Sequence, residues 1–225
     1  ATKRYTLPPS HIPLIHLEIL AEEIGRCVPA DVPLWGDAKS GIEDLTAEMS
    51  DSAAAQHTAR GEYATEVATR MTNWRMEVQE RLTSNEQPVN MARMCHELNN
   101  TLPADGILVA DGGFAAHWTG LLCETKTPGR NYIANRGFAS IGYGLPGSMG
   151  AQLAAGDRPV VGVTGDGGFN MMIGELETAG RLNCGLTILI VNNAASGYVK
   201  ALQQAQFGGH FQSSDLREMN YANLA

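Results

Sequence analysis

The feature that most constrains the fold is a pair of nearly uninterrupted apolar runs in the second half of the chain. Residues 159–163 and residues 186–191 are almost wholly aliphatic, and a helix-length segment, residues 171–182, separates them. Strands that are apolar without alternation are buried on both faces, as in a parallel sheet covered by helices on each side. We therefore predict an α/β fold whose parallel sheet has helices on both faces.

Shorter segments extend this α/β pattern in both directions. Apolar and β-branched runs predict further strands, and residues with helical periodicity predict further helices. The expected strands are residues 13–19, 32–35 and 106–110, and the expected helical segments are residues 21–25, 39–45, 91–102 and 145–155. Residues 1–49 are too few to form a core, so they are expected to be the tail of a second α/β domain.

The segment between these parts, residues 50–87, is polar and rich in Ala, Thr, Glu and Arg. Five apolar residues recur in it at helical spacing, which predicts one amphipathic helix within a linker that Pro88 ends. They are Val67, Met71, Trp74, Val78 and Leu82.

Composition excludes several classes of protein. The net charge of −8 over 225 residues disfavours nucleic-acid binding. No stretch is long and apolar enough for a membrane span, and residues 1–9 lack the apolar core of a secretory signal. The four cysteines are dispersed, without CxxC spacing, so a disulfide framework or zinc site is not expected. These features favour a cytoplasmic protein.

A glycine-rich turn follows the first of the two apolar runs. Gly165, Gly167 and Gly168 let the backbone approach a ligand with exposed amides, and a helix start would add positive potential for a phosphate. Asp166 would repel a phosphate unless Mg²⁺ lay between them, because Mg²⁺ commonly bridges carboxylates and phosphates. A purely structural turn is the alternative for this segment alone.

The second apolar run ends at Asn192 and Asn193. The carboxyl ends of parallel strands meet at one edge of the sheet, where ligands bind. An amide oxygen beside the Asp166 carboxylate would suit a magnesium ion, although Asn193 could instead only cap a turn. A third turn, residues 111–113, follows the strand expected at residues 106–110.

The segment from Gly165-Asp166-Gly167 to Asn192-Asn193 resembles the thiamine-diphosphate motif of the acetolactate synthase, pyruvate oxidase and benzaldehyde lyase group. The resemblance covers nearly the whole chain. It implies that residues 1–49 end a middle domain and that residues 50–87 form a linker. Residues 88–225 then form the diphosphate- and Mg²⁺-binding domain, incomplete at its C-terminus, and the chain stops at Ala225 in the first part of a helix.

The resemblance also implies a role for individual residues. Asp166 and Asn193 would hold Mg²⁺ through their side chains, and Ala195 through its backbone carbonyl. Gly167 and Gly168 would donate amides to the diphosphate, which residues 113–115 would cover from the other side. The implied cofactor-binding positions are Gly113, Phe114, Ala115, Ala139, Ile141, Gly165, Asp166, Gly167, Gly168, Asn193, Ala195 and Gly197.

Residues 137–146 match a further part of the family pattern. Ile141 stands where a bulky apolar side chain wedges between the two rings of the cofactor, which makes it the one catalytic position assigned in this chain. The Ala139 carbonyl would accept a hydrogen bond from the aminopyrimidine. The alternative is that Ile141 is an ordinary core residue.

The family's catalytic glutamate belongs to a pyrimidine-binding domain, which residues 1–225 do not resemble. The resemblance therefore implies a partner domain, from the same full-length chain or another subunit, and a homodimer or homotetramer. Glu175 and Glu177 are interpreted as structural. Leu202 stands where acetohydroxyacid synthases place a tryptophan, which argues against acetolactate synthesis. Residues 18–20 lack the second acid of many FAD-binding relatives, so FAD is possible but not favoured.

The resulting hypothesis is a thiamine-diphosphate- and Mg²⁺-dependent lyase or transferase that is acetolactate synthase-like. It would cleave or form carbon–carbon bonds in a 2-oxo acid or aldehyde. A second hypothesis is a non-catalytic cofactor-binding or regulatory subunit whose partner supplies the pyrimidine-binding domain. A third, a nucleotide-binding α/β protein without thiamine diphosphate, is disfavoured by the pairing of Asp166 with Asn193.

Overall fold

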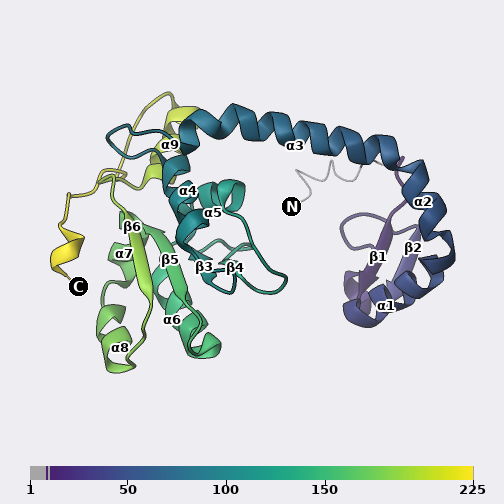
Figure 1. The fold of residues 1–225 in the computed structure, drawn as a ribbon. Coiled ribbons are helices and arrows are strands. Elements are labelled where there is room, and N and C mark those ends of the chain that lie inside the picture. Colours follow the sequence, from purple (N-terminus) through teal and green to yellow (C-terminus); the bar gives the residue numbers. More distant parts are fainter. Residues whose placement is uncertain (1–8, 10, 225) are drawn as a thin grey trace. The chain divides into compact units, whose positions relative to one another are not determined.

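The computed structural model describes residue 9 and residues 11–224. Two sequence expectations, the absence of a secretory core in residues 1–9 and a helix running into Ala225, fall wholly or partly outside the described residues. The chain forms two compact units, residues 1–73 and 74–225. Figure 1 colours the ribbon along the sequence, from purple near the N-terminus to yellow near the C-terminus. The division lies within the segment interpreted as a linker.

The first unit is built on two parallel strands, β1 (Ile15–Glu18) and β2 (Val32–Trp35), with a 3-10 turn, η1 (Ala21–Glu23), between them. Helix α1 (Ala38–Met49) begins where the Asp37 carboxylate accepts hydrogen bonds from the amides of Lys39 and Ser40, at 3.0 and 3.1 Å. Such a cap satisfies amides that have no partner within the helix. The strands were predicted, whereas α1 is longer than the expected residues 39–45.

Residues 50–82 of the expected linker are almost entirely helical, whereas the prediction was one amphipathic helix with the remainder as linker. A 3-10 turn, η2 (Ser50–Ser52), leads into α2 (Ala53–Ala59) and then α3 (Gly61–Leu82). Ala, Glu and Arg are strong helix formers, and no proline interrupts this stretch, so local propensity extends the helix beyond its apolar stripe. On that stripe Val78 is buried, whereas Val67 and Met71 are exposed.

The second unit contains a four-stranded parallel sheet in the order β4-β3-β5-β6. Its strands are β3 (Ile107–Ala110), β4 (Tyr132–Ala134), β5 (Val160–Gly165) and β6 (Thr187–Val191). The short edge strand β4 was not predicted. The other three match the predicted runs to within two residues. The aliphatic residues of β3 are buried, most of those in β5 are buried, and those of β6 are partly buried.

Helices cover both faces of this sheet, as predicted. The remaining helical elements are α4 (Met91–Thr101), α5 (Phe114–Leu122), α6 (Gly144–Ala155), α7 (Asp166–Met172), α8 (Glu175–Arg181), α9 (Gly197–Phe207) and η3 (Tyr221–Asn223). Leu98 of α4 packs with Leu108 and Val163 on one face. Residues of α6, α7 and α8 pack on the other face, around Leu145 and Phe169.

One predicted helix, residues 171–182, is wrong in its boundaries. The structure has two short helices there, α7 and α8, which separate at Ile173 and Gly174. Glycine is a weak helix former, so the chain can change direction at this point. Helix α7 begins at Asp166 itself, immediately after β5.

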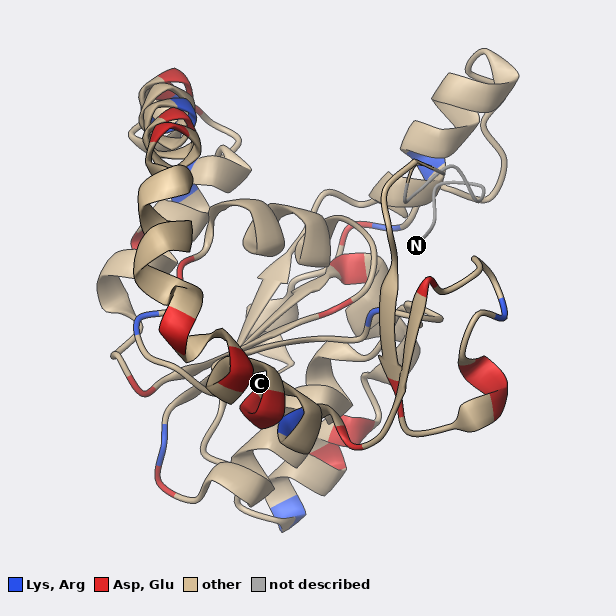
Figure 2. Cartoon of the chain, turned by 90° about the vertical axis from the view of Figure 1, so that its right-hand side faces the viewer, with Lys and Arg blue, Asp and Glu red and all other residues tan. Residues whose placement is uncertain are grey.

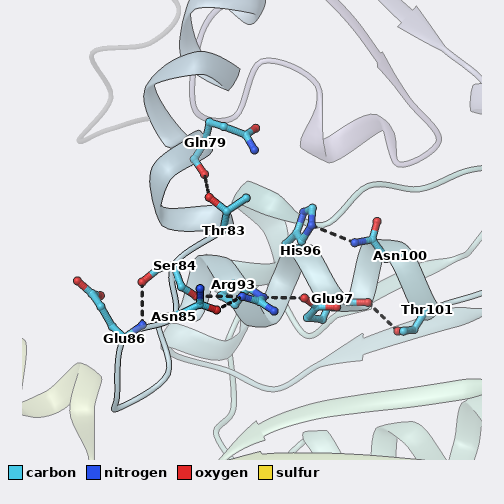
Figure 3. A network of polar contacts seen from close by, with 10 residues as sticks. All are labelled: Gln79, Thr83, Ser84, Asn85, Glu86, Arg93, His96, Glu97, Asn100 and Thr101. Carbon is cyan, nitrogen blue, oxygen red and sulfur yellow. Dashed lines mark hydrogen bonds and ion pairs between the residues drawn. The ribbon is translucent and has the colours of Figure 1, made fainter.

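Polar contacts fasten the connection between α3 and α4 (Figure 3). The Arg93 guanidinium donates to the Ser84 carbonyl at 3.1 Å, to the Asn85 side chain at 2.9 Å and to Glu97 at 2.6 Å. Asn90 caps α4 by accepting from the Ala92 amide at 3.0 Å. This network fixes the start of α4, which supplies Met91 and Met94 to the cavity described below.

Two of the dispersed cysteines meet in space. Cys95 is buried, and Cys123 packs against the same apolar cluster. The Cys95 thiol donates to the Trp118 carbonyl at 3.6 Å. The neighbouring Cys123 thiol lowers the pKa of Cys95, whereas the neighbouring Cys95 thiol and burial raise the pKa of Cys123. The two cysteines are far apart in the sequence, so their proximity could not be predicted from it.

Charged residues are spread over the described chain (Figure 2). Lys and Arg do not gather in one segment of it, in keeping with the net charge of −8. None of the helices within the described residues combines the length and the apolar character that a membrane crossing requires.

Candidate functional site

The candidate site lies where β3, β5 and β6 end. Pairing of Ala110 with Val163 and of Gly165 with Val191 brings the loops after these strands to one edge of the sheet. A cavity of about 290 Å³ opens there. Of the predicted cofactor positions, those lining it are Gly113, Phe114, Ala115, Ile141, Gly165, Asp166, Gly167, Gly168, Asn193 and Gly197, whereas Ala139 and Ala195 lie outside its lining.

Asp166 and Asn193 converge on one backbone amide. Asp166 is 1% exposed, and its Oδ1 accepts from the Gly167 amide at 2.9 Å. The Ala195 N–H donates to Asp166 Oδ2 at 3.2 Å and to Asn193 Oδ1 at 3.3 Å. Two side-chain oxygens from neighbouring strand ends thus accept from the same backbone amide, and both are of the kind that hard cations take as ligands.

The chemistry of these donors suits Mg²⁺ better than a transition metal. Within the described residues, no group of three His, Cys, Asp or Glu side chains could hold a metal ion. A cation at this edge would instead rely on one carboxylate, one amide oxygen, backbone carbonyls and oxygens of its ligand. Mg²⁺ is commonly bound by one or two carboxylates together with substrate phosphates.

Glycines leave room along the cavity wall. A Cβ at Gly165 would meet nothing within 4 Å, and one at Gly167 would lie 3.4 Å from the nearest atom, in Leu216. Gly113 has φ +68°, a conformation that glycine adopts readily and other residues rarely do. The backbone therefore lies open to a ligand at two of the three strand ends.

Gly168 serves a different purpose from its neighbours. A Cβ there would lie 2.3 Å from Asp111 Oδ2 and 3.0 Å from Thr164 Oγ1. The residue is glycine because a buried carboxylate occupies the space beside it. Its predicted amide contact with a diphosphate stays a prediction.

The segment before α6 carries the predicted wedge. Ile141 lines the cavity and is 42% exposed, so it is not a core residue of the described chain. Ala139 has φ +52°, and its carbonyl oxygen lies 2.9 Å from the Cβ position of Gly112. The Asn135 side chain donates to the Ser140 carbonyl and holds the segment from the β4 side.

Asp111 is a cavity residue to which sequence reasoning assigned no role. It is 1% exposed, and its carboxylate accepts hydrogen bonds from the amides of Gly112, Gly142 and Tyr143 and from the Thr164 hydroxyl. The available signal was an acidic residue directly after four apolar strand residues, in the turn at residues 111–113. Its partners could not be read from the sequence because Gly142 is far along the chain.

An aromatic cluster borders the cavity. The Tyr198 ring stacks on His117 with 5.3 Å between centroids, and Phe114 meets Tyr198 edge to face at 5.3 Å. Phe114 and Tyr198 line the cavity. Offset and edge-to-face contacts of this kind stabilise aromatic pairs, so the cluster holds the start of α5 against the start of α9.

A second strap supports the loop that carries Asn193. Ala195 forms an antiparallel bridge with Asp215, the Ser196 amide donates to the Ser214 carbonyl at 2.8 Å, and Lys200 pairs with Asp215. Sequence reasoning missed this strap because it depends on backbone pairing between two loops. It fixes the Ala195 amide toward which Asp166 and Asn193 point.

The fold and the site together define an α/β protein in which the ends of parallel strands bring a carboxylate, an amide oxygen and glycine-rich backbone to the edge of one cavity. Residues 111–225 match the family described as thiamine pyrophosphate enzyme, C-terminal TPP binding domain. The chain belongs to this family. The match begins at Asp111 and so includes all three loops of the site.

Individual relatives extend the similarity over more of the chain. It is 29% identical over 91% of its length to a probable acetolactate synthase large subunit of Methanocaldococcus jannaschii. It is 25% identical over 94% of its length to an acetolactate synthase isozyme large subunit of Escherichia coli, and 28% identical over 96% to a sulfoacetaldehyde acetyltransferase of Roseovarius nubinhibens. These alignments cover 34%, 36% and 38% of the relatives, so the chain spans about a third of their length.

Proposed function

We propose that this chain is the cofactor-binding part of a thiamine-diphosphate- and Mg²⁺-dependent lyase or transferase. The enzyme would cleave or form a carbon–carbon bond in a 2-oxo acid or aldehyde. The observation that carries the proposal is the convergence of Asp166 and Asn193 on the Ala195 amide, beside a cavity bordered by open glycines.

In this proposal the strand ends bind and orient. Asp166 and Asn193 would hold Mg²⁺, with the Ala195 carbonyl as a further ligand, and would thereby anchor the diphosphate. Residues 113–115 cover the diphosphate from the β3 side, and the backbone of residues 165–168 and Gly197 lines the other side. Thiamine diphosphate, when bound, supplies a nucleophilic carbanion and an electron sink.

Ile141 shapes the cofactor rather than reacting with substrate. Its exposed side chain borders the cavity and would wedge between the two rings, while the Ala139 carbonyl accepts a hydrogen bond from the aminopyrimidine. Positioning of this kind can contribute several kcal/mol to a reaction barrier because the reacting atoms are held close beforehand.

The proton-transfer partner must come from outside the described cavity. Asp111 and Asp166 are the acidic residues of its lining, and both are engaged by backbone amides. We propose that a pyrimidine-binding domain, from the same full-length chain or another subunit, supplies a glutamate within a cytoplasmic homodimer or homotetramer. The same observation favours the second candidate, a non-catalytic cofactor-binding subunit.

The proposed substrate class rests on the names of the relatives and on one residue, Leu202, that differs from the acetohydroxyacid synthase pattern. Their names include acetolactate synthases and a sulfoacetaldehyde acetyltransferase, which are consistent with 2-oxo acid and aldehyde chemistry. Leu202, at 40% exposure, replaces the tryptophan typical of acetohydroxyacid synthases, so we favour a substrate other than that of acetolactate synthesis. FAD is not favoured as a second cofactor.

Calorimetry on the full-length protein tests the metal assignment. Asp166→Ala should abolish Mg²⁺-dependent binding of thiamine diphosphate, because the carboxylate is the one charged ligand proposed for the ion. Asp157→Ala makes the same charge change at an exposed turn residue and should bind as wild type does. Unchanged affinity in Asp166→Ala would refute the assignment.

A substrate screen separates the two functional candidates. Full-length protein loaded with thiamine diphosphate and Mg²⁺ is assayed for decarboxylation and carboligation across small 2-oxo acids and aldehydes. Turnover of any of them supports an enzyme. Cofactor binding without turnover, in the presence of its pyrimidine-binding partner, supports the non-catalytic subunit.

A further inference from the structure

Asp111 joins three segments of the chain at the floor of the cavity. It follows β3, and its Oδ1 accepts from the Gly112, Gly142 and Tyr143 amides at 2.6, 2.9 and 3.0 Å. Its Oδ2 accepts from the Gly142 amide at 3.2 Å and from the Thr164 hydroxyl at 2.6 Å. One buried carboxylate thus ties the end of β3 to β5 and to the turn before α6.

The surroundings are shaped to this carboxylate. A Cβ at Gly168 would overlap its Oδ2, and a Cβ at Gly144 would lie 3.1 Å from Asp111 Cβ and 2.7 Å from Thr164 Cβ. Glycines from α6 and α7 therefore make the space that the Asp111–Thr164 pair fills. A buried polar group of this kind is tolerated because all its neighbours satisfy it, and it is costly once one partner is removed.

The wedge segment has few other anchors. Phe138 is fully exposed and Ile141 is 42% exposed, so packing within the described chain does not hold residues 138–141 in place. Their polar anchors are the Asn135 contact with the Ser140 carbonyl on one side and the Asp111 contacts with the Gly142 and Tyr143 amides on the other. Of these two anchors, Asp111 is the buried one. It holds the amide of Gly142, which is the residue next to Ile141 in the chain.

We propose that Asp111 is a positioning residue, whose carboxylate sets where Ile141 and the Ala139 carbonyl stand over the cavity. This inference rests on the proposed function, because the wedge matters only if thiamine diphosphate binds there. Asp111 itself takes no part in the proton transfer. It acts through the Gly142 and Tyr143 amides, which it holds from beneath.

The test uses Asp111→Asn in the full-length protein. The substitution keeps the shape but removes the negative charge and turns one acceptor oxygen into a donor. In either orientation of the new amide, the Gly142 N–H then faces an NH₂ group in place of one of its two acceptor oxygens. Three quantities are measured: the Kd of thiamine diphosphate with Mg²⁺, the rate of C2 proton exchange per bound cofactor by NMR, and amide hydrogen exchange of residues 138–143. Leu98→Ala, in the buried cluster around α4, is the control for a general loss of stability.

The expected result is a Kd within about threefold of wild type and a C2 exchange rate lowered about 10- to 100-fold, the range expected for an ångström-scale misplacement. Amide exchange of residues 138–143 should accelerate in Asp111→Asn and not in Leu98→Ala. Equal changes in both variants would overturn the proposal, as would an unchanged C2 exchange rate in Asp111→Asn.

Two further measurements distinguish a folding defect or a lack of cofactor binding from the absence of a positioning role. If Asp111→Asn does not fold, Thr164→Val removes one of the same hydrogen bonds without changing shape. It should lower the C2 exchange rate and accelerate amide exchange of residues 138–143, each by less than expected for Asp111→Asn. If wild-type protein does not bind thiamine diphosphate, the proposed function fails. Amide exchange still decides whether Asp111 holds the segment, and unaltered protection in the variant would then refute the positioning role.

Discussion

Replacing Gly168 by alanine tests the packing around Asp111 most directly. The added Cβ would lie 2.3 Å from Asp111 Oδ2, 3.0 Å from Thr164 Oγ1 and 3.2 Å from Asp111 Cγ. Real Cβ contacts do not come as close as the first of these. Neither neighbour can yield easily, because both are buried and they are hydrogen-bonded to each other at 2.6 Å.

The size of the effect follows from three contributions. Overpacking a close-packed site costs about 1–3 kcal/mol. Displacing the Thr164 hydroxyl from a charged acceptor removes about 1.5–3 kcal/mol more. Alanine is favoured over glycine within a helix by about 0.5–1 kcal/mol, which offsets part of the loss. The net decrease in the free energy of unfolding is about 2–5 kcal/mol.

Equilibrium unfolding in urea measures this change. Gly150→Ala is a matched control, because Gly150 lies within α6 and its Cβ would meet nothing within 4 Å. That variant should be as stable as wild type or more stable by up to about 1 kcal/mol. If Gly168→Ala proves as stable as Gly150→Ala, the Asp111–Thr164 packing described here is wrong.

Three further perturbations probe other parts of the second unit. Burial raises the pKa of the Tyr132 phenol, so its protonated form stabilises the fold below the unfolded pKa of about 10 and this stabilisation is lost as pH rises further. Tyr132→Phe removes the hydroxyl's contacts with Thr119 and the Ala116 carbonyl, at 3.1 and 3.2 Å, and should cost about 1 kcal/mol at neutral pH. The difference from wild type in thermal denaturation should close above about pH 10, where the wild-type phenol ionises on unfolding. Asn99→Ala removes hydrogen bonds to the Leu122 carbonyl and the Glu124 amide, at 2.8 and 2.9 Å. It should lower the free energy of unfolding, measured in urea, by about 1–3 kcal/mol. Asn100→Ala, at an exposed position, is the control. Thiamine diphosphate with Mg²⁺ should raise the Tm of wild type, and EDTA should remove that increase; an EDTA-insensitive increase would contradict metal-dependent binding.

The strand ends could be predicted from sequence because each follows an aliphatic run whose burial is determined locally. The runs that became β5 and β6 required a parallel sheet, and adjacent parallel strands placed Asp166 near Asn193. The extent of helix in residues 50–87 was missed because weak periodicity concealed good helix propensity. The break between α7 and α8 was missed because its only sign was one glycine, Gly174.

Contacts between distant loops lay beyond sequence reasoning for a physical reason. Asp111 and Gly142 are 31 residues apart, and nothing in either segment specifies that a side chain of one will accept from the backbone of the other. Backbone donors leave no trace in residue identity. The surrounding glycines are the one sign of this packing in the sequence, and Gly144 and Gly168 could equally have been explained as helix starts.

The two buried aspartates of this site show how the same residue type takes different tasks at neighbouring strand ends. Each follows a strand directly, each is 1% exposed, and within the described residues neither forms an ion pair with Lys, Arg or His. Asp111 accepts from three amides and a hydroxyl, which is close to the number of donors a carboxylate can accommodate. Asp166 accepts from two amides, one of them at 3.2 Å, and has acceptor capacity left. A buried carboxylate with unused capacity is costly unless a positive charge compensates it. We therefore infer that Asp111 is satisfied within its own chain, whereas Asp166 keeps acceptor capacity that the proposed Mg²⁺ would use.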